Sequence, residues 1–326
     1  MEVNLCDIEK TLCKECRFIG EYDDVKDRKK EYIISMLGWF RENSIIITRK
    51  SITYTIDIRT MVNKKEIKIV SDKKCSIMEM YYHTMEILRF ENLFDGIFFN
   101  VKSFVADDIE YVEYIRDVQL SYYTSEKRYL NFPFEFTNRE YKKYYNKWLK
   151  IEKKNKIIHP VFLFSTYLNG MTTDLRMALL LEIFEPIAEA LHERGDIVLV
   201  KPPYKEFSNK CKKCGSTVSR KVPNKELTFA DKIKPLIKKY GKEIFVKENT
   251  KNLVSKAVKV RNKVDHVKAN TVNVMNGKQC GFYIYKFSLM YRYIMLIELG
   301  LNDKLIEQTI SSWIEAFDKN YSHLII

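Results

Sequence analysis

The chain has 326 residues, of which 46% are hydrophobic, and it contains only 10 Gly and 7 Pro. This composition excludes a disordered chain and disfavours a sandwich of many tight turns, while the length suits two domains or one large one. No apolar run reaches the roughly 18 residues of a membrane span, and the first residues lack the pattern of a secretory signal. We therefore expect a cytoplasmic protein with reduced thiols and no membrane partner.

The positive charge is concentrated in one region. Of the formal net charge of +13, all of the excess lies between Lys201 and Asn270, where 20 Lys and Arg face 6 Asp and Glu. Such a concentration attracts a polyanion and favours its binding by counterion release. The alternative is an ordinary solvated lysine-rich surface, which is common in proteins.

The first part of the chain predicts a mixed α/β domain over residues 1–137. A capping box of Ser76 and Glu79 indicates the start of a helix over 76–94. Four segments are rich in β-branched and aromatic residues and predict strands: 44–49, 51–59, 66–70 and 97–105. One of them, 51–59, alternates apolar and polar residues, as a half-buried strand does.

The rest of the chain has the periodicity of helices. Residues 138–156 predict a charged connecting helix, and 157–326 predict an all-α domain with a basic insertion at 196–227. Pro186 is expected to kink the long helix over 172–195. The other helices are expected at 228–241, 250–267, 281–300 and 302–320. The predicted fold class is thus α+β, an N-terminal mixed α/β domain followed by a helical bundle.

The segment VRNKVDHVKAN, residues 260–270, is the candidate catalytic motif. It places Arg261, Asn262 and His266 within one and a half turns of a helix, with Asn262 and His266 on one face and Arg261 beside it. The spacing alone is weak support, and Arg261 could instead form a surface ion pair with Asp265 four residues later.

The residue types nevertheless suit RNA cleavage without a metal. A histidine titrates in the range needed for a general acid or base, and an arginine fork stabilises charge on a phosphorane. Asn262 could orient the ribose, the phosphate or the imidazole. One copy supplies a single histidine, so a pair would require a symmetric dimer.

The motif resembles the Arg-x(4–6)-His motif of HEPN ribonucleases. Four further segments are similar, in order and character, to the HEPN domain of ApeA-type anti-phage proteins: WLKIEKKNKIIHPVFLFSTYL, MALLLEIFEPIAEALHE, FADKIKPLIKKYG and FSLMYRYIMLIELGLNDKLIEQTI. The resemblance covers about 148–326 well and 40–136 loosely. The N-terminal part looks like a short version of the ApeA N-terminal domain, with which it would share a sensing role.

The resemblance implies a metal-independent endoribonuclease of abortive infection, with a composite site in a homodimer and a phage component as trigger. Arg261 matches the motif arginine, His266 the motif histidine and Asn262 the polar position. Glu182, on the long helix, is expected to line the same site. RNA, such as tRNA, would be the substrate, and the flanking lysines Lys259, Lys263 and Lys268 are its expected contacts.

Two Cys-x2-Cys pairs could hold a structural zinc ion. They are Cys13 with Cys16, and Cys211 with Cys214. Four thiolates would close a tetrahedral site and leave no open position for catalysis. That site forms only if the two pairs meet; separate free thiols, or a redox role, are the alternatives.

Two other functions compete with the nuclease. The chain could be a non-catalytic RNA-binding or adaptor module, or an interaction protein whose N-terminal domain senses a partner while the bundle dimerises. The intact set of Arg261, Asn262 and His266 favours the enzyme over both.

Overall fold

The computed structural model describes residues 12–21, 42–61, 64–96, 100–110, 131–167, 171–210, 214, 216–223, 226–265 and 274–326. By internal contacts the chain divides into two compact units. Unit 1 comprises 1–171 and 292–313, and unit 2 comprises 172–291 and 314–326. The predicted division into 1–137, 138–156 and 157–326 follows different boundaries, since the segment predicted as a connecting helix lies within unit 1.

Unit 1 contains a six-stranded sheet with the order β2-β3-β4-β1-β5-β6, in which all neighbouring strands are antiparallel. The strands are β1 (Leu12–Glu21), β2 (Asn43–Arg49), β3 (Ile52–Met61), β4 (Lys64–Ser76), β5 (Asn100–Ala106) and β6 (Ile109–Glu110). The apolar residues of β2, Ile45 and Ile47, are buried while Ile46 is exposed, so one face of the sheet carries the core.

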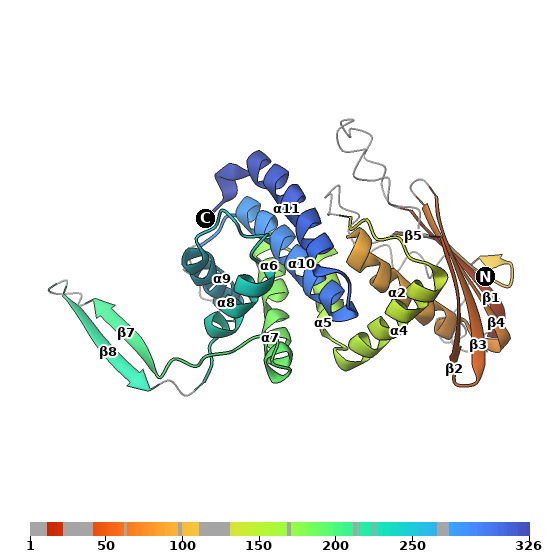
Figure 1. The fold of residues 1–326 in the computed structure, drawn as a ribbon, viewed down its shortest axis with the longest axis horizontal. Coiled ribbons are helices and arrows are strands. Elements are labelled where there is room, and N and C mark those ends of the chain that lie inside the picture. The colour runs from red at the N-terminus through yellow and green to blue at the C-terminus, as the bar shows by residue number, and fades with distance from the viewer. Residues whose placement is uncertain are drawn as a thin grey trace. The chain divides into compact units, whose positions relative to one another are not determined.

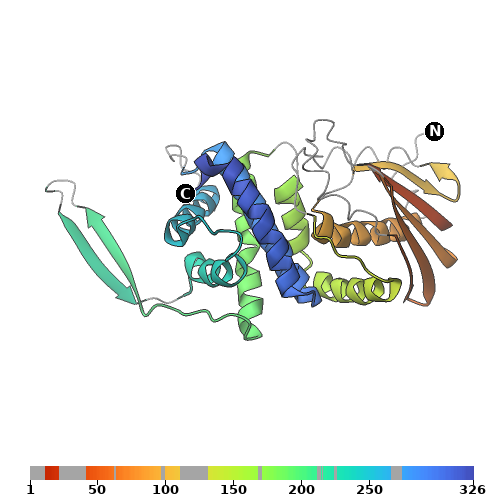
Figure 2. The same cartoon turned by 45° about the horizontal axis from the view of Figure 1, so that its top comes forward.

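Helices cover that buried face. Helix α2 (Ile77–Asp95) packs against β1 and β4, and α4 (Asn138–Lys154) packs against α2 and β2 (Figures 1 and 2). The predicted cap is present, because the Ser76 hydroxyl accepts a hydrogen bond from the Glu79 backbone N–H at 3.1 Å. Helix α5 (Ile158–Tyr167) completes the described helices between 77 and 167.

Unit 2 is built around helices α6 (Thr173–Glu182), α7 (Phe184–Glu193), α8 (Phe229–Tyr240) and α9 (Thr250–Asp265). Helix α6 packs against α7 and α9, and α8 packs against α7 and α9. Two longer helices, α10 (Gly277–Leu299) and α11 (Asp303–Asn320), contribute residues to both units, and a short 3-10 helix, η3 (Ser322–Leu324), follows.

The segment predicted as one kinked helix is two helices. Helix α6 ends at Glu182 and α7 begins at Phe184, so the break lies shortly before Pro186, in the first turn of α7. A proline ring cannot donate to the carbonyl four residues earlier and clashes with it, which here is the carbonyl of Glu182. In the first turn of a new helix the missing N–H costs little.

The basic insertion contains a hairpin that the sequence did not predict. Strands β7 (Tyr204–Lys210) and β8 (Thr217–Pro223) pair with each other in a separate antiparallel sheet (Figure 1). The prediction of an all-α domain therefore lacks this element, although the α+β fold class holds. Among the described helices, none is long and apolar enough to cross a membrane.

Candidate functional site

Helix α9 carries the first residues of the motif and presents them at its C-terminal end. Its buried face consists of Leu253, Val254, Ala257 and Val260, which recur at spacings of three and four. Arg261 follows Ala257 by four residues, so it lies at the edge of this buried face, with its side chain 20% exposed. Asn262, the next residue, is exposed.

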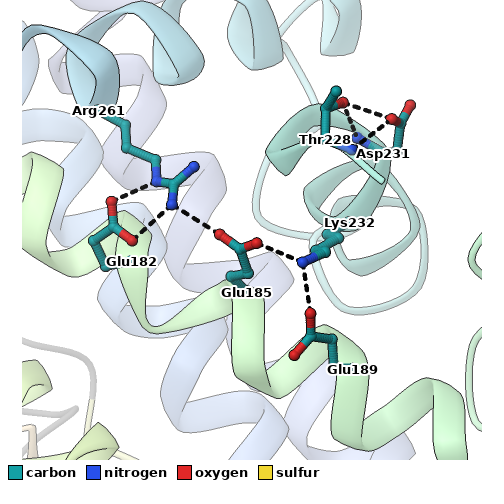
Figure 3. Close-up of polar contacts among 7 residues, drawn as sticks. All are labelled: Glu182, Glu185, Glu189, Thr228, Asp231, Lys232 and Arg261. Atoms are coloured by element: carbon teal, nitrogen blue, oxygen red, sulfur yellow. Dashed lines mark hydrogen bonds and ion pairs between the residues drawn. The ribbon is translucent and has the colours of Figure 1, made fainter. Parts of the chain in front are cut away.

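The guanidinium of Arg261 is engaged by two carboxylates of the α6–α7 segment (Figure 3). Its Nε donates to Glu182 Oε1, and its Nη2 donates to Glu182 Oε2 at 2.9 Å. The same Nη2 lies 2.8 Å from Glu185 Oε2. Glu182 thus binds the arginine through both oxygens, the fork geometry that is also used for phosphate.

The contacts continue to a second cation, Lys232 of α8 (Figure 3). Its Nζ donates to Glu185 and to Glu189, the latter at 2.5 Å. Burial by itself would lower the pKa of Lys232, but the hydrogen bonds and charges of Glu185 and Glu189 outweigh burial and raise it. Glu182, Glu185 and Glu189 therefore face two cations, and the cluster as a whole is negative.

Helix α8 is fixed at its start by local contacts. The Thr228 backbone N–H donates to Asp231 Oδ2 at 2.9 Å, and the Asp231 N–H donates to the Thr228 hydroxyl at 3.3 Å (Figure 3). This capping box places Phe229, the first residue of α8, against the arginine, with the Arg261 Cζ 4.8 Å from the ring centroid. A cation over an aromatic face is stabilised, and the ring restricts the guanidinium to one side.

An anion that approaches the Arg261 guanidinium meets carboxylates that are already bound to it. An arginine has five N–H donors in a planar fork, and carboxylates occupy the edge formed by Nε and Nη2. A phosphodiester that uses this edge must displace Glu182 or approach beside it. The site therefore contains a guanidinium that could bind a phosphate and whose orientation is fixed by protein carboxylates.

The structure describes some of the predicted site residues and not others. It brings Glu182 to Arg261, and it leaves Asn262 and Lys259 exposed on α9. Lys263 lies on α9, but its side chain is not among the described ones. His266 and Lys268 fall outside the described residues. The roles of all of these residues in catalysis or RNA binding stay predictions.

Three residues of the cluster were missed by the sequence analysis. Glu185, Glu189 and Lys232 carry the contacts beyond Glu182. Glu182, Glu185 and Glu189 are spaced by three and four residues, which places acidic side chains on one helical stripe even across the break. That stripe was a readable signal, whereas Lys232 is one of several lysines of α8 and only tertiary contacts single it out.

The cysteine pairs lie in different units. Cys13 and Cys16 are both buried in β1, with their sulfur atoms 3.4 Å apart, because a bulge between Cys13 and Glu15 shifts the alternation of the strand. Their shared hydrogen bond lowers the pKa of Cys13 and raises that of Cys16. Cys214 is exposed in unit 2, and Cys211 lies outside the described residues. Within the described part of the chain, no three His, Cys, Asp or Glu side chains form a metal-binding group.

Comparison with known proteins identifies the helical region. Residues 187–305 match the model of a protein family described as Apea-like HEPN. No curated protein and no solved structure matches the chain. The matched segment runs from α7 into α11 and includes the hairpin, α8 and the whole Arg261 motif. Residues 187–305 of this chain are therefore similar to an Apea-like HEPN domain.

Proposed function

We propose that the chain is a metal-independent endoribonuclease of HEPN type that cleaves RNA, such as tRNA, during anti-phage abortive infection. The observation that carries the proposal is the position of Arg261. It is held in a fixed orientation at the end of α9, five residues before His266, within the segment that matches the family. The HEPN domain is generally a nuclease fold.

In the proposed reaction, Arg261 stabilises negative charge on the phosphorane formed when the ribose 2′-hydroxyl attacks the adjacent phosphate. His266 acts as general base or acid, because an imidazole can take the 2′-hydroxyl proton or protonate the leaving 5′-oxygen. The products are a 2′,3′-cyclic phosphate and a 5′-hydroxyl. A second histidine comes from the second copy in a homodimer, and Asn262 orients the reacting groups.

Three further parts of the proposal concern partners and location. A phage component triggers the enzyme, the protein acts in the cytoplasm, and a structural zinc ion is held by cysteines without a part in catalysis. Cys13 and Cys16 belong to unit 1, while Cys214 belongs to unit 2.

The first prediction concerns cleavage itself. Purified wild-type protein with end-labelled tRNA and mRNA in EDTA should produce defined fragments, at a rate that rises when lysate of phage-infected cells supplies the trigger. The yield should fall at higher salt, because phosphate contacts weaken with salt. The variant His266→Ala should lose at least about 100-fold in rate, the usual contribution of a general acid or base. His323→Ala, which removes an exposed histidine outside the motif, is the matched control and should cleave normally.

A second candidate function is favoured by one observation. Arg261 is already bound by two carboxylates, as a purely structural arginine would be. The chain would then be a non-catalytic RNA-binding or phage-sensing adaptor that uses the bundle to dimerise. RNA binding that is equal in wild type and His266→Ala, with no cleavage by either protein even after addition of infected-cell lysate, would support this function.

A further inference from the structure

The β7–β8 hairpin is a strongly basic element to which no role has been assigned. Between Tyr204 and Pro223 the sequence has six Lys and Arg, at 205, 210, 212, 213, 220 and 221, against one acidic residue, Glu206. Among the described strands, β7 and β8 pair only with each other, so the hairpin belongs to no larger sheet. A two-stranded hairpin with this charge contributes little to a hydrophobic core.

The hairpin has dimensions that suit a nucleic acid backbone. Each strand has seven residues, or about 23 Å at about 3.3 Å per residue. Along the axis of a double helix each strand presents one phosphate about every 3.4 Å, so that length spans about seven phosphates of a duplex strand. In the observed register, Phe207 pairs with Arg220 and Glu206 with Lys221. Positions 220 and 221 thus lie on opposite faces, and neither face lacks a basic position.

The hairpin is also tethered to the Arg261 cluster. It is inserted between α7, which carries Glu185 and Glu189, and α8, which carries Lys232. Five residues lie between Pro223 and Phe229, so the two positions are at most about 21 Å apart along an extended chain. Phe229 itself lies against Arg261, so one RNA strand can reach both the hairpin and the arginine.

We propose that the β7–β8 hairpin is an RNA-binding arm that contacts phosphates of the substrate outside the Arg261 cluster. Its function is to hold the RNA by charge, while the Arg261 motif acts on a single phosphate. A membrane surface is a poorer fit for this charge, because segments that bind one combine a charged face with an apolar one. The role of the arm in holding a substrate rests on the proposed function. Its binding of RNA, however, can be measured without cleavage.

The test compares two full-length variants that lose the same charge. The arm variant carries Lys205→Gln, Lys210→Gln, Arg220→Gln and Lys221→Gln. The control variant carries Lys234→Gln, Lys238→Gln, Lys247→Gln and Lys251→Gln, at exposed positions of the same unit. Both are made in a His266→Ala background, so that cleavage does not disturb binding, and circular dichroism checks that both are folded.

Binding of a fluorescein-labelled single-stranded RNA is followed by anisotropy between about 50 and 200 mM salt. The arm variant should bind about tenfold or more weakly at low salt. Its slope of log affinity against log salt should be shallower by up to about 3, since each lost phosphate contact removes about 0.7. The control variant should stay within about threefold of the parent.

Three results would overturn the proposal. They are an unchanged slope in the arm variant, an equal loss in both variants, and binding to anionic vesicles, rather than RNA, that depends on the four arm residues. Failure of the nuclease proposal would look different, because wild type would then bind RNA through the arm without cleaving it.

Discussion

At the scale of single residues, the contact between Glu182 and Arg261 decides what an anion would meet at the motif. The carboxylate uses the same two donors that a phosphodiester would use, and Glu182, Glu185 and Glu189 outnumber Arg261 and Lys232. Under the proposed function, RNA competes with these carboxylates for the guanidinium, and this exchange offsets part of its binding free energy.

The variant Glu182→Gln tests this competition. Glutamine keeps the shape and removes the charge, so RNA should bind several-fold more tightly, consistent with about 1 kcal/mol for a partly exposed charged contact. Glu189→Gln is the matched control, because Glu189 contacts Lys232 and its side chain is 52% exposed. Anisotropy in the His266→Ala background measures both. Weaker binding by Glu182→Gln would show that the carboxylate positions Arg261 for RNA instead of competing with it.

A second residue-scale feature is the buried ion cluster of Lys286, Glu248 and Asp318. The Lys286 Nζ lies 2.7 Å from Glu248 Oε1 and 2.7 Å from Asp318 Oδ1, and all three side chains are at most 1% exposed. Burial raises the pKa of Glu248, and the opposing effects of Lys286 do not cancel it. Removal of the lysine would leave two buried carboxylates without their cation.

The variant Lys286→Met should therefore lose about 3–5 kcal/mol of unfolding free energy near neutral pH. A carboxyl whose pKa is higher in the folded state binds its proton more tightly there. Its contribution is thus most favourable below about pH 4.3 and declines as the pH rises through the folded pKa. Urea unfolding at about pH 5 and pH 7.5 should show the smaller loss at pH 5, and Glu248→Gln added to Lys286→Met should reduce the difference. Equal losses at both pH values, with or without Glu248→Gln, would contradict this interpretation.

The residue types of the site were readable from the sequence, but their contacts were not. Glu182 was expected near Arg261 because of a family resemblance, and the structure places them in contact. Lys232 could not have been selected, since nothing in the local sequence distinguishes it from Lys234 or Lys238. Its proximity to Glu185 depends on how α8 packs against α7, which is a tertiary property.

At the scale of elements, strong local signals predicted well. The cap at Ser76 and the apolar periodicity gave the approximate limits of most described helices. Strand β1 and the β7–β8 hairpin were missed for a common reason. Strand β1 is LCKECRFIGE, β7 is YKEFSNK and β8 is TVSRKVP, and none of them shows a clear alternation of apolar and polar residues. Their pairing is therefore set by the partner strand rather than by the pattern.

The break between α6 and α7 shows how an element boundary can serve the site. Pro186 was expected to kink a continuous helix, yet the helix ends at Glu182. Glu182 and Glu185 thus lie on two different helices but contact the same guanidinium. The sequence predicts that Pro186 disturbs the helix. Whether the helix kinks or ends there depends on packing against α8 and α9.

At the scale of the whole molecule, the chain consists of two compact units that are interleaved in sequence, because residues 292–313 belong with the N-terminal part. Sequence periodicity assigned these residues to the helical domain, since it reports which face of a helix is buried and not what buries it. The Arg261 cluster, by contrast, lies wholly within unit 2. The proposed composite site therefore requires a second copy of the chain and forms only in the dimer.

The most direct test of the central claim, that Arg261 and His266 form half of a composite ribonuclease site, is cleavage by a mixed dimer. Wild type and His266→Ala are co-expressed with different tags, and the dimer that carries both tags is isolated. In EDTA its cleavage of end-labelled tRNA should fall far below half of the wild-type dimer's rate, because the composite site then lacks one of its two histidines. A mixed dimer that retains half of the wild-type rate, or a wild-type protein that cleaves as a monomer, would contradict the claim.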